Sequence, residues 1–221
     1  MAKATDRSGS RPAERSAVRP IGKAAVAATG TAVGAGLWWR RNPSPCPYGQ
    51  RFWIEAPRPL ITRDRLSEAL APAPGERILE VGPGTGYYSL PMARRLVPDG
   101  SLDIFDLQQE MLDHTLRRAA EEGLDNVSAT RGDAQELSYS AASSNAAFLV
   151  TVLGEVPDPG KALLELRRVL KPEGRLVVGE LLGDPHMVTV GSLKRLSERA
   201  GFRLERRVGP VIGYFARLRP T

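Results

Sequence analysis

A carboxylate followed by three evenly spaced glycines is the most chemically informative pattern in this chain of 221 residues. Glu80 lies in the apolar run RILEV, and Gly82, Gly84 and Gly86 follow it, ahead of an amphipathic run that starts near Ser89. Glycine allows positive φ and lets a ligand approach the backbone closely. The N–H groups at the start of the following helix favour a polar or anionic ligand group. The pattern predicts a buried strand, a tight turn and a helix that together hold a nucleotide-like ligand.

The spacing of the glycines narrows the choice of ligand. A dinucleotide site needs the order G-x-G-x-x-G, and Tyr87 stands where its third glycine would be. A carboxylate two residues before the first glycine suits an ammonium group better than a pyrophosphate. We therefore interpret Glu80 as a partner for a cationic ligand group.

The order Glu-x-Gly-x-Gly-x-Gly resembles the first motif of the class I S-adenosylmethionine-dependent methyltransferases, whose glycine loop holds the amino-acid end of the cofactor. The segment LDIFDLQQEML at 102–112 is similar to the second motif, and RGDAQEL at 131–137 is similar to the loop that contacts adenine. The segments VPDP at 156–159 and RVLKPEGRLVV at 168–178 resemble the quinone-methylase-like branch, methyltransferase type 11. The resemblance covers roughly residues 62–218 and implies S-adenosyl-L-methionine as cofactor.

This resemblance assigns roles to individual residues. Glu80 and the glycines would hold the methionyl end, and Asp106, about twenty residues past the loop, would accept both ribose hydroxyls. Asp133 would accept a hydrogen bond from the adenine amino group. The full set expected to contact the cofactor is Glu80, Gly82, Gly84, Gly86, Tyr87, Asp106, Leu107, Asp133, Ala134 and Thr151.

Two residues are candidates for the chemistry at the methyl acceptor. A sulfonium methyl group is already activated, so the protein mainly positions the acceptor in a dry site. A phenolic or enolic acceptor would need a base, for which His186, in the segment GDPHM, and Glu155 are the candidates. Each also has a structural interpretation as a residue that packs its own loop, whereas His114 is expected to be solvated.

The elements that must position these residues follow from turns, caps and hydrophobic periodicity. Thr62, Asp158 and Thr189 are expected to cap helices. Strands are expected at 77–81, 101–105, 126–130, 146–153, near 174–178, at 202–208 and at 211–218. Alternating strands and helices predict an α/β fold with a doubly wound, mostly parallel seven-stranded sheet, Rossmann-like, with an N-terminal extension. In the family it resembles, the last two strands form a hairpin that adds an antiparallel edge.

Size and composition point to one domain with an extension and exclude some kinds of site. With 42% hydrophobic residues, the chain can bury one sizeable core. Cys46 is the only cysteine and the chain has two histidines, so it can form no intrachain disulfide and no ordinary zinc site is expected. We expect no bound metal and a cytoplasmic location for the folded part.

The charge of the chain is unevenly distributed. Residues 1–65 hold 12 Lys or Arg and 4 Asp or Glu, a net charge of +8, whereas the whole chain carries +6, so the remainder carries −2. A basic extension favours an anionic partner such as lipid head groups or nucleic acid. The absence of a basic excess after residue 65 argues against a nucleic-acid channel in the domain.

The N-terminal extension divides into three segments. Residues 1–22 are expected to be a disordered basic tail. Residues 23–41 contain the uncharged run AAVAATGTAVGAGLWW followed by two arginines, and 16 residues of helix would span about 24 Å. Three interpretations stay open for 24–41: a membrane-associated anchor, a helix packed on or tethered to the domain, and a signal peptide.

Residues 42–61 are rich in proline and aromatic residues, with five prolines between 42 and 60. Proline prevents a regular helix or central strand there. The segment is expected to be either a linker or a flap over the acceptor site. The methyltransferase-like domain is expected at 62–221.

Three functions remain in competition. The favoured one is methyl transfer from S-adenosylmethionine to a small, apolar acceptor of quinone, phenolic, polyketide or lipid type. A nucleic-acid methyltransferase is the second, although TVLG at 151–154 stands where an Asn-Pro-Pro-aromatic motif would follow the fourth strand. The third is a cofactor-binding, membrane-tethered protein without turnover. The sequence does not set the oligomeric state.

Overall fold

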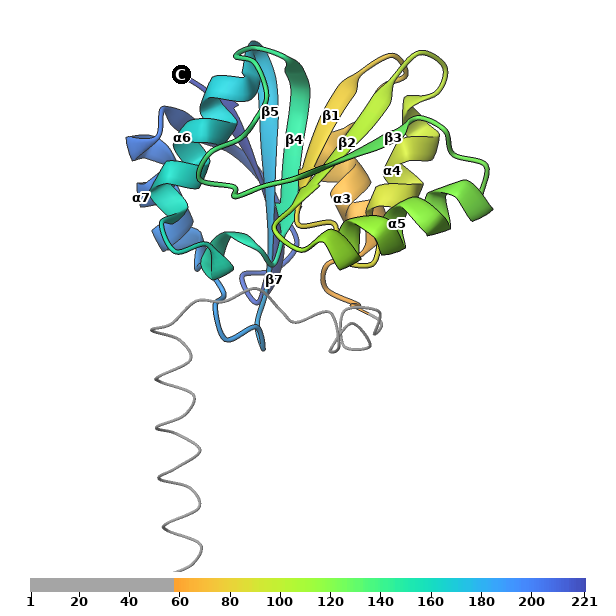
Figure 1. Cartoon of the computed structure of the whole chain (residues 1–221). Helices are drawn as coiled ribbons and strands as arrows, with labels where there is room; N and C mark the ends of the chain where they lie inside the picture. The colour runs from red at the N-terminus through yellow and green to blue at the C-terminus, as the bar shows by residue number, and fades with distance from the viewer. Residues whose placement is uncertain (1–57) are drawn as a thin grey trace, which may run out of the picture. The chain divides into compact units, whose positions relative to one another are not determined.

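The computed structural model describes residues 58–221, which form a seven-stranded sheet in the order β3-β2-β1-β4-β5-β7-β6 with helices on both faces (Figure 1). The expected segments 1–22, 23–41 and most of 42–61 lie outside these residues. No helix in residues 58–221 combines the length and the apolar character needed to cross a bilayer. The strands are β1 Arg77–Val81, β2 Ser101–Asp106, β3 Val127–Arg131, β4 Ser144–Val150, β5 Leu170–Leu181, β6 Phe202–Val208 and β7 Gly213–Pro220.

The first five strands are parallel, and β1 lies at the centre between β2 and β4. The apolar runs of β1, β2, β4 and β5 are buried because helices cover both faces of a parallel sheet, whereas β3 at the edge is only partly buried. The chain order reverses between β1 and β4, and the carboxyl ends of these strands open at that switch point, where ligands bind in doubly wound sheets. The predicted doubly wound α/β fold is confirmed.

Five helices cover the sheet in two groups (Figure 1). Their apolar sides contribute to two separate clusters of buried residues, one on each face of the sheet. Thr62, Asp158 and Thr189 accept hydrogen bonds from the third residue after them, so all three predicted caps are confirmed. One face carries α3 Arg63–Leu70, α4 Ser89–Leu96 and α5 Gln109–Glu121, and the other carries α6 Pro159–Val169 and α7 Val190–Arg199.

The structure corrects the sequence prediction at three places. The fourth strand ends at Val150 rather than at 153, because Thr151 has a φ of 55° and the chain then forms a 3-10 turn, η2, Leu153–Glu155. The fifth strand starts at Leu170, because a register shift lets it pair with Ser144 before the main ladder. The segment 132–143 contains no helix, so strand and helix do not alternate there. The last two strands form the expected hairpin at an antiparallel edge of the sheet: β7 pairs with β5, and β6 lies outside β7.

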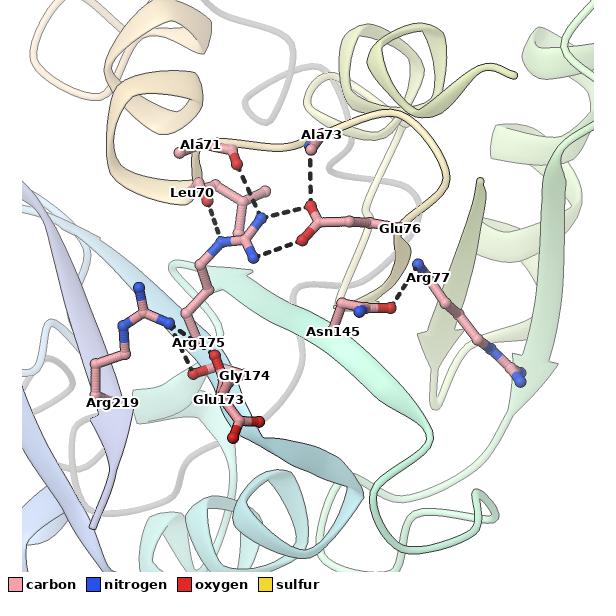
Figure 2. Close-up of polar contacts among 10 residues, drawn as sticks. All are labelled: Leu70, Ala71, Ala73, Glu76, Arg77, Asn145, Glu173, Gly174, Arg175 and Arg219. Carbon is pink, nitrogen blue, oxygen red and sulfur yellow. Dashed lines mark hydrogen bonds and ion pairs between the residues drawn. The ribbon is translucent and has the colours of Figure 1, made fainter. Parts of the chain in front are cut away.

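A buried ion pair fastens α3 to the amino end of the sheet. Arg175 on β5 makes two hydrogen bonds of 2.8 and 2.6 Å to the carboxylate of Glu76 and also donates to the carbonyls of Leu70 and Ala71 at the end of α3 (Figure 2). Partial burial alone would raise the pKa of Glu76, but hydrogen bonds from Arg175 and Ala73 outweigh it and lower that pKa. The guanidinium therefore joins a strand, a helix end and the turn into β1.

We predict that Arg175→Met destabilises the fold by about 3–5 kcal/mol, because it leaves a partly buried carboxylate and two carbonyls without their partner. Arg206→Met is the matched control, since Arg206 pairs with Glu68 at an exposed site where such pairs contribute about 0–1 kcal/mol. Urea denaturation measures both. The stabilisation by the Glu76–Arg175 pair is present above the ordinary glutamate pKa of about 4.3 and is lost as the pH falls through the lowered pKa of Glu76. The difference in stability between Arg175→Met and the unmodified protein should therefore shrink in acid. Equal stability of the two variants at neutral pH would contradict this account.

Candidate functional site

The glycine loop between β1 and α4 has a backbone that only glycine adopts easily. Gly82, Gly84 and Gly86 have φ values of 72°, 56° and 81°. A Cβ on Gly82 would lie 2.4 Å from a methyl carbon of Val152, and one on Gly86 would lie 3.0 Å from a methyl carbon of Thr115. The loop is thus packed closely between the turn after β4 and helix α5.

Side chains of helix α5 hold this loop by donating hydrogen bonds to the loop's backbone carbonyl groups. The Thr115 hydroxyl donates to the carbonyl of Gly84 at 3.1 Å, and the Arg118 guanidinium donates to the carbonyl of Thr85 at 2.6 Å. In a trans peptide the carbonyl and the N–H point in opposite directions, so the N–H of Thr85 is turned away from α5. This N–H group can therefore donate a hydrogen bond to a ligand on the side of the loop opposite α5.

Glu80 is a buried carboxyl group directly before the loop, with 2% of its surface exposed. Its Oε2 has no hydrogen-bond partner among the described residues. Burial raises its pKa to about 8, and the nearby carboxylate of Asp106 adds to the rise. A cationic ligand group beside Glu80 would lower that pKa again and satisfy the buried oxygen.

Asp106 ends β2, the strand next to β1, and its carboxylate accepts the backbone N–H of Gln108 at 2.8 Å. Burial raises the pKa of Asp106 to about 6, although backbone hydrogen bonds oppose the rise. The next residue, Leu107, has 50% of its surface exposed. The two residues together offer a hydrogen-bonding carboxylate beside an exposed apolar side chain.

Asp133 and Ala134 follow β3 and lie further along the same edge. Both oxygens of Asp133 accept from the side-chain amide of Gln135, at 2.9 and 3.1 Å, and one also accepts the backbone N–H of that residue. A ligand amino group would have to share or replace these bonds. Ala134 packs against the buried cluster beside Leu137.

The two aromatic residues after the loop have different surroundings. The Cζ atom of Arg63 lies 4.1 Å from the centre of the Tyr87 ring. Both residues line an open groove together with side chains of α5. Tyr88 is buried, and its hydroxyl donates to the carbonyl of Ile61 at 2.5 Å. The side chain of Tyr87 therefore packs toward the outside of the loop, while Tyr88 ties the loop to the segment that precedes α3.

The candidates beyond β4 lie on two segments that contact each other. Thr151 has a positive φ, which is strained for a β-branched residue, and its N–H donates to the carbonyl of Gly179 at 2.8 Å. Glu155 ends η2, and a Cβ on Gly154 in that turn would overlap the carbonyl oxygen of His186. The structure thus brings the segments of Glu155 and His186 together, although they are far apart in the sequence. Within residues 58–221, no group of three or more His, Cys, Asp or Glu is arranged to hold a metal ion.

Sequence reasoning missed two acidic residues here. Glu180, near the end of β5, has 1% of its surface exposed, and Asp184 accepts the backbone N–H of His186 at 2.8 Å. Glu180 lies within the apolar run LVVGELL, and a carboxyl group inside a strand that is otherwise apolar is the one signal that could have identified it.

The chain is similar to known methyltransferases. Residues 78–174 match the family described as "Methyltransferase domain". The chain is 31% identical over 175 residues to a protein-L-isoaspartate O-methyltransferase of Methanopyrus kandleri, covering 77% of this chain and 72% of that protein. It is 33% identical over 153 residues to the ubiquinone/menaquinone biosynthesis C-methyltransferase UbiE of Ruegeria sp. (strain TM1040), covering 69% and 59%.

Among solved structures, a SAM-dependent methyltransferase from Aquifex aeolicus has the same fold, with a TM-score of 0.72 at 20% identity, covering 79% of this chain and 98% of that one. The chain spans between 33% and 72% of the lengths of the first curated relatives that it matches.

We predict that Gly82→Ala destabilises the protein more than Gly75→Ala does. Both glycines have a positive φ, 72° and 79°, so both variants carry the backbone cost of about 1–2 kcal/mol. Only at Gly82 does the new methyl group meet another side chain, because nothing lies within 4 Å of a Cβ on Gly75. The difference between the two variants in the free energy of unfolding, measured by urea denaturation, gives the packing contribution. Equal losses of stability would show that the contact with Val152 adds nothing to the cost.

Proposed function

We propose that this chain, which belongs to the class I S-adenosylmethionine-dependent methyltransferases, transfers the sulfonium methyl group of that cofactor to a small, apolar acceptor of quinone, phenolic, polyketide or lipid type. The observation that carries the proposal is the order of groups along one edge of the sheet. Glu80 and the glycine loop follow β1, Asp106 ends β2 and Asp133 follows β3. This order matches the methionyl, ribose and adenine parts of the cofactor.

The residues present fit the cofactor. The buried Oε2 of Glu80, without a partner in the described part of the chain, suits the methionyl ammonium group, and the carboxylate of Asp106 suits the two ribose hydroxyls. Leu107 offers an apolar surface beside the adenine ring. The bound cofactor supplies an electrophilic methyl group, so this chain has to hold the acceptor in line with it and keep water away.

The small apolar acceptor is supported by two observations. The UbiE relative acts, by its name, in ubiquinone and menaquinone biosynthesis. Residues 58–221 contain 22 Lys or Arg and 22 Asp or Glu, so they have no basic excess of the kind that a nucleic-acid partner requires. We place the acceptor at the carboxyl ends of β4 and β5, near Thr151, Glu155 and His186.

Calorimetric titration tests the cofactor directly. The protein should bind S-adenosylmethionine with micromolar affinity and should not bind NADH, because Tyr87 replaces the third glycine of a dinucleotide site. Binding of NADH alone would overturn the proposal.

We predict that Asp106→Asn weakens S-adenosylmethionine binding about 10- to 100-fold, because hydrogen bonds to a charged group contribute about 1.5–3 kcal/mol. Asp113→Asn, on the exposed side of α5, is the control and should leave the affinity unchanged. A carboxylate that binds hydroxyls must be ionised, so the affinity of the unmodified protein should fall as the pH drops through about 6, the raised pKa of Asp106. Asp106→Asn should lose the part of the pH dependence near pH 6 and keep the part near pH 8 that Glu80 contributes. An unchanged affinity in Asp106→Asn would remove Asp106 from the site.

The anchor interpretation of residues 24–41 also remains a proposal, because that segment lies outside the described residues. The full chain should co-sediment with vesicles that contain anionic phosphatidylglycerol, and the double change Trp38→Ser, Trp39→Ser should reduce the bound fraction severalfold. Full binding by the double variant, or none by the unmodified chain, would favour a helix that packs on the domain or tethers it.

A further inference from the structure

In the described part of the chain, only one of the two oxygens of the buried Glu180 carboxyl group is held by a hydrogen bond. Its Oε2 accepts the backbone N–H of Val188 at 3.1 Å, and the hydroxyl of Tyr214, its neighbour in register on β7, donates to the carbonyl of Val188 at 2.6 Å. Side chains from two strands thus hold both polar groups of one loop residue. The other oxygen, Oε1, has no hydrogen-bond partner among the described residues.

The charges around Glu180 are mostly negative. Burial is the main cause that raises its pKa well above the ordinary value, and the carboxylates of Asp184 and Glu155 add to the rise. These two residues come from the loop after β5 and from η2, and Tyr214 faces Glu180 from β7. Arg58 and His186 oppose the rise in the pKa of Asp184, and Arg207 opposes that of Tyr214, but none of the three is among the causes that act on Glu180. No arginine or lysine in the described part of the chain forms an ion pair with Glu180, so a structural ion pair does not explain why it is buried.

Glu180 lies next to the segments at which we place the acceptor. The preceding residue, Gly179, pairs with Val150 at the end of β4 and accepts the N–H of the strained Thr151. The loop after Glu180 packs against η2 at His186. The carboxyl group therefore lies at the junction of the carboxyl ends of β4 and β5, the side of the switch point opposite Asp106.

We propose that Glu180 is the general base of the reaction and that the acceptor is a hydroxyl compound, such as a phenol or enol, whose proton passes to Oε1. This inference rests on the proposed function and names the atom that takes the proton. The acceptor oxygen forms a bond to the methyl carbon as the carbon–sulfur bond breaks, and its electron pair stays on sulfur. The proton leaves the acceptor oxygen for Glu180, so charge and atoms balance without a further reactant.

The surroundings of Glu180 suit this role and this class of acceptor. A carboxyl group with a raised pKa is a stronger base than an exposed glutamate, and bases work best when their pKa lies near the working pH. A neutral hydroxyl group can enter and give up its proton.

Glu180→Gln tests the base, because glutamine keeps the shape and can still accept the N–H of Val188 but cannot take a proton. The probes are 4-methylphenol, which is neutral at pH 8, and 4-nitrophenol, which is ionised there and needs no base. With S-adenosylmethionine, Glu180→Gln should lose about 100- to 1000-fold in kcat on 4-methylphenol and threefold or less on 4-nitrophenol. The affinity for S-adenosylmethionine, measured by calorimetry, should stay within about twofold.

Tyr214→Phe is the matched control, because it removes the other half of the contact to Val188 without removing a proton acceptor. Any loss it causes should be the same for both phenols. The proposal is overturned if Glu180→Gln retains activity on 4-methylphenol, if it loses activity equally on both phenols, or if the unmodified protein binds S-adenosylmethionine but methylates neither phenol. Failure of the unmodified protein to bind S-adenosylmethionine would instead reject the proposed function itself.

Discussion

The close approach of Gly82 to Val152 is the constraint on which the rest of the site depends. It joins the loop after β1 to the turn after β4, two segments about seventy residues apart that meet because their strands are parallel neighbours. A side chain at position 82 would push these segments apart. The proposed methionyl contacts lie on the first segment, and the candidate Glu155 lies on the second. In the proposed reaction, the alignment of cofactor and acceptor therefore depends on this contact.

The two ends of the sheet have opposite electrostatic character. At the amino end, acidic groups are paired: Glu76 with Arg175 and Asp103 with Arg77, at 2.6 Å in each case (Figure 2 shows the first pair). These ion pairs join β1 to β2 and tie β5 to α3 and to the turn before β1. The amino end therefore contributes stability without taking part in the site.

At the carboxyl end, the buried acids lack such partners. Burial raises the pKa of Glu80 to about 8 and of Asp106 to about 6, and raises that of Glu180 well above its ordinary value. In residues 58–221, no ion pair joins any of the three to an arginine or lysine. Keeping buried acids unpaired costs stability, and it leaves the oxygens free to respond to a cationic cofactor and to an acidic acceptor proton. Two acids that form ion pairs thus lie at the amino end of the sheet, and these three acids, without ion pairs in the described residues, lie at the carboxyl end, where doubly wound sheets bind ligands.

The sequence by itself determined the succession of strands along the chain up to β5, the helix caps and the glycine loop after β1. These features depend on local chemistry: apolar runs, capping hydroxyls or carboxylates, and glycines where φ must be positive. It could not place Glu180, because an isolated acid in an apolar strand has no local partner from which to read its role. Only the tertiary structure showed that η2 and the loop at 182–189 meet, that β7 inserts beside β5, and that Asp133 already bonds to Gln135. Those facts depend on contacts between residues far apart in the chain, and such contacts leave no spacing pattern in a single sequence.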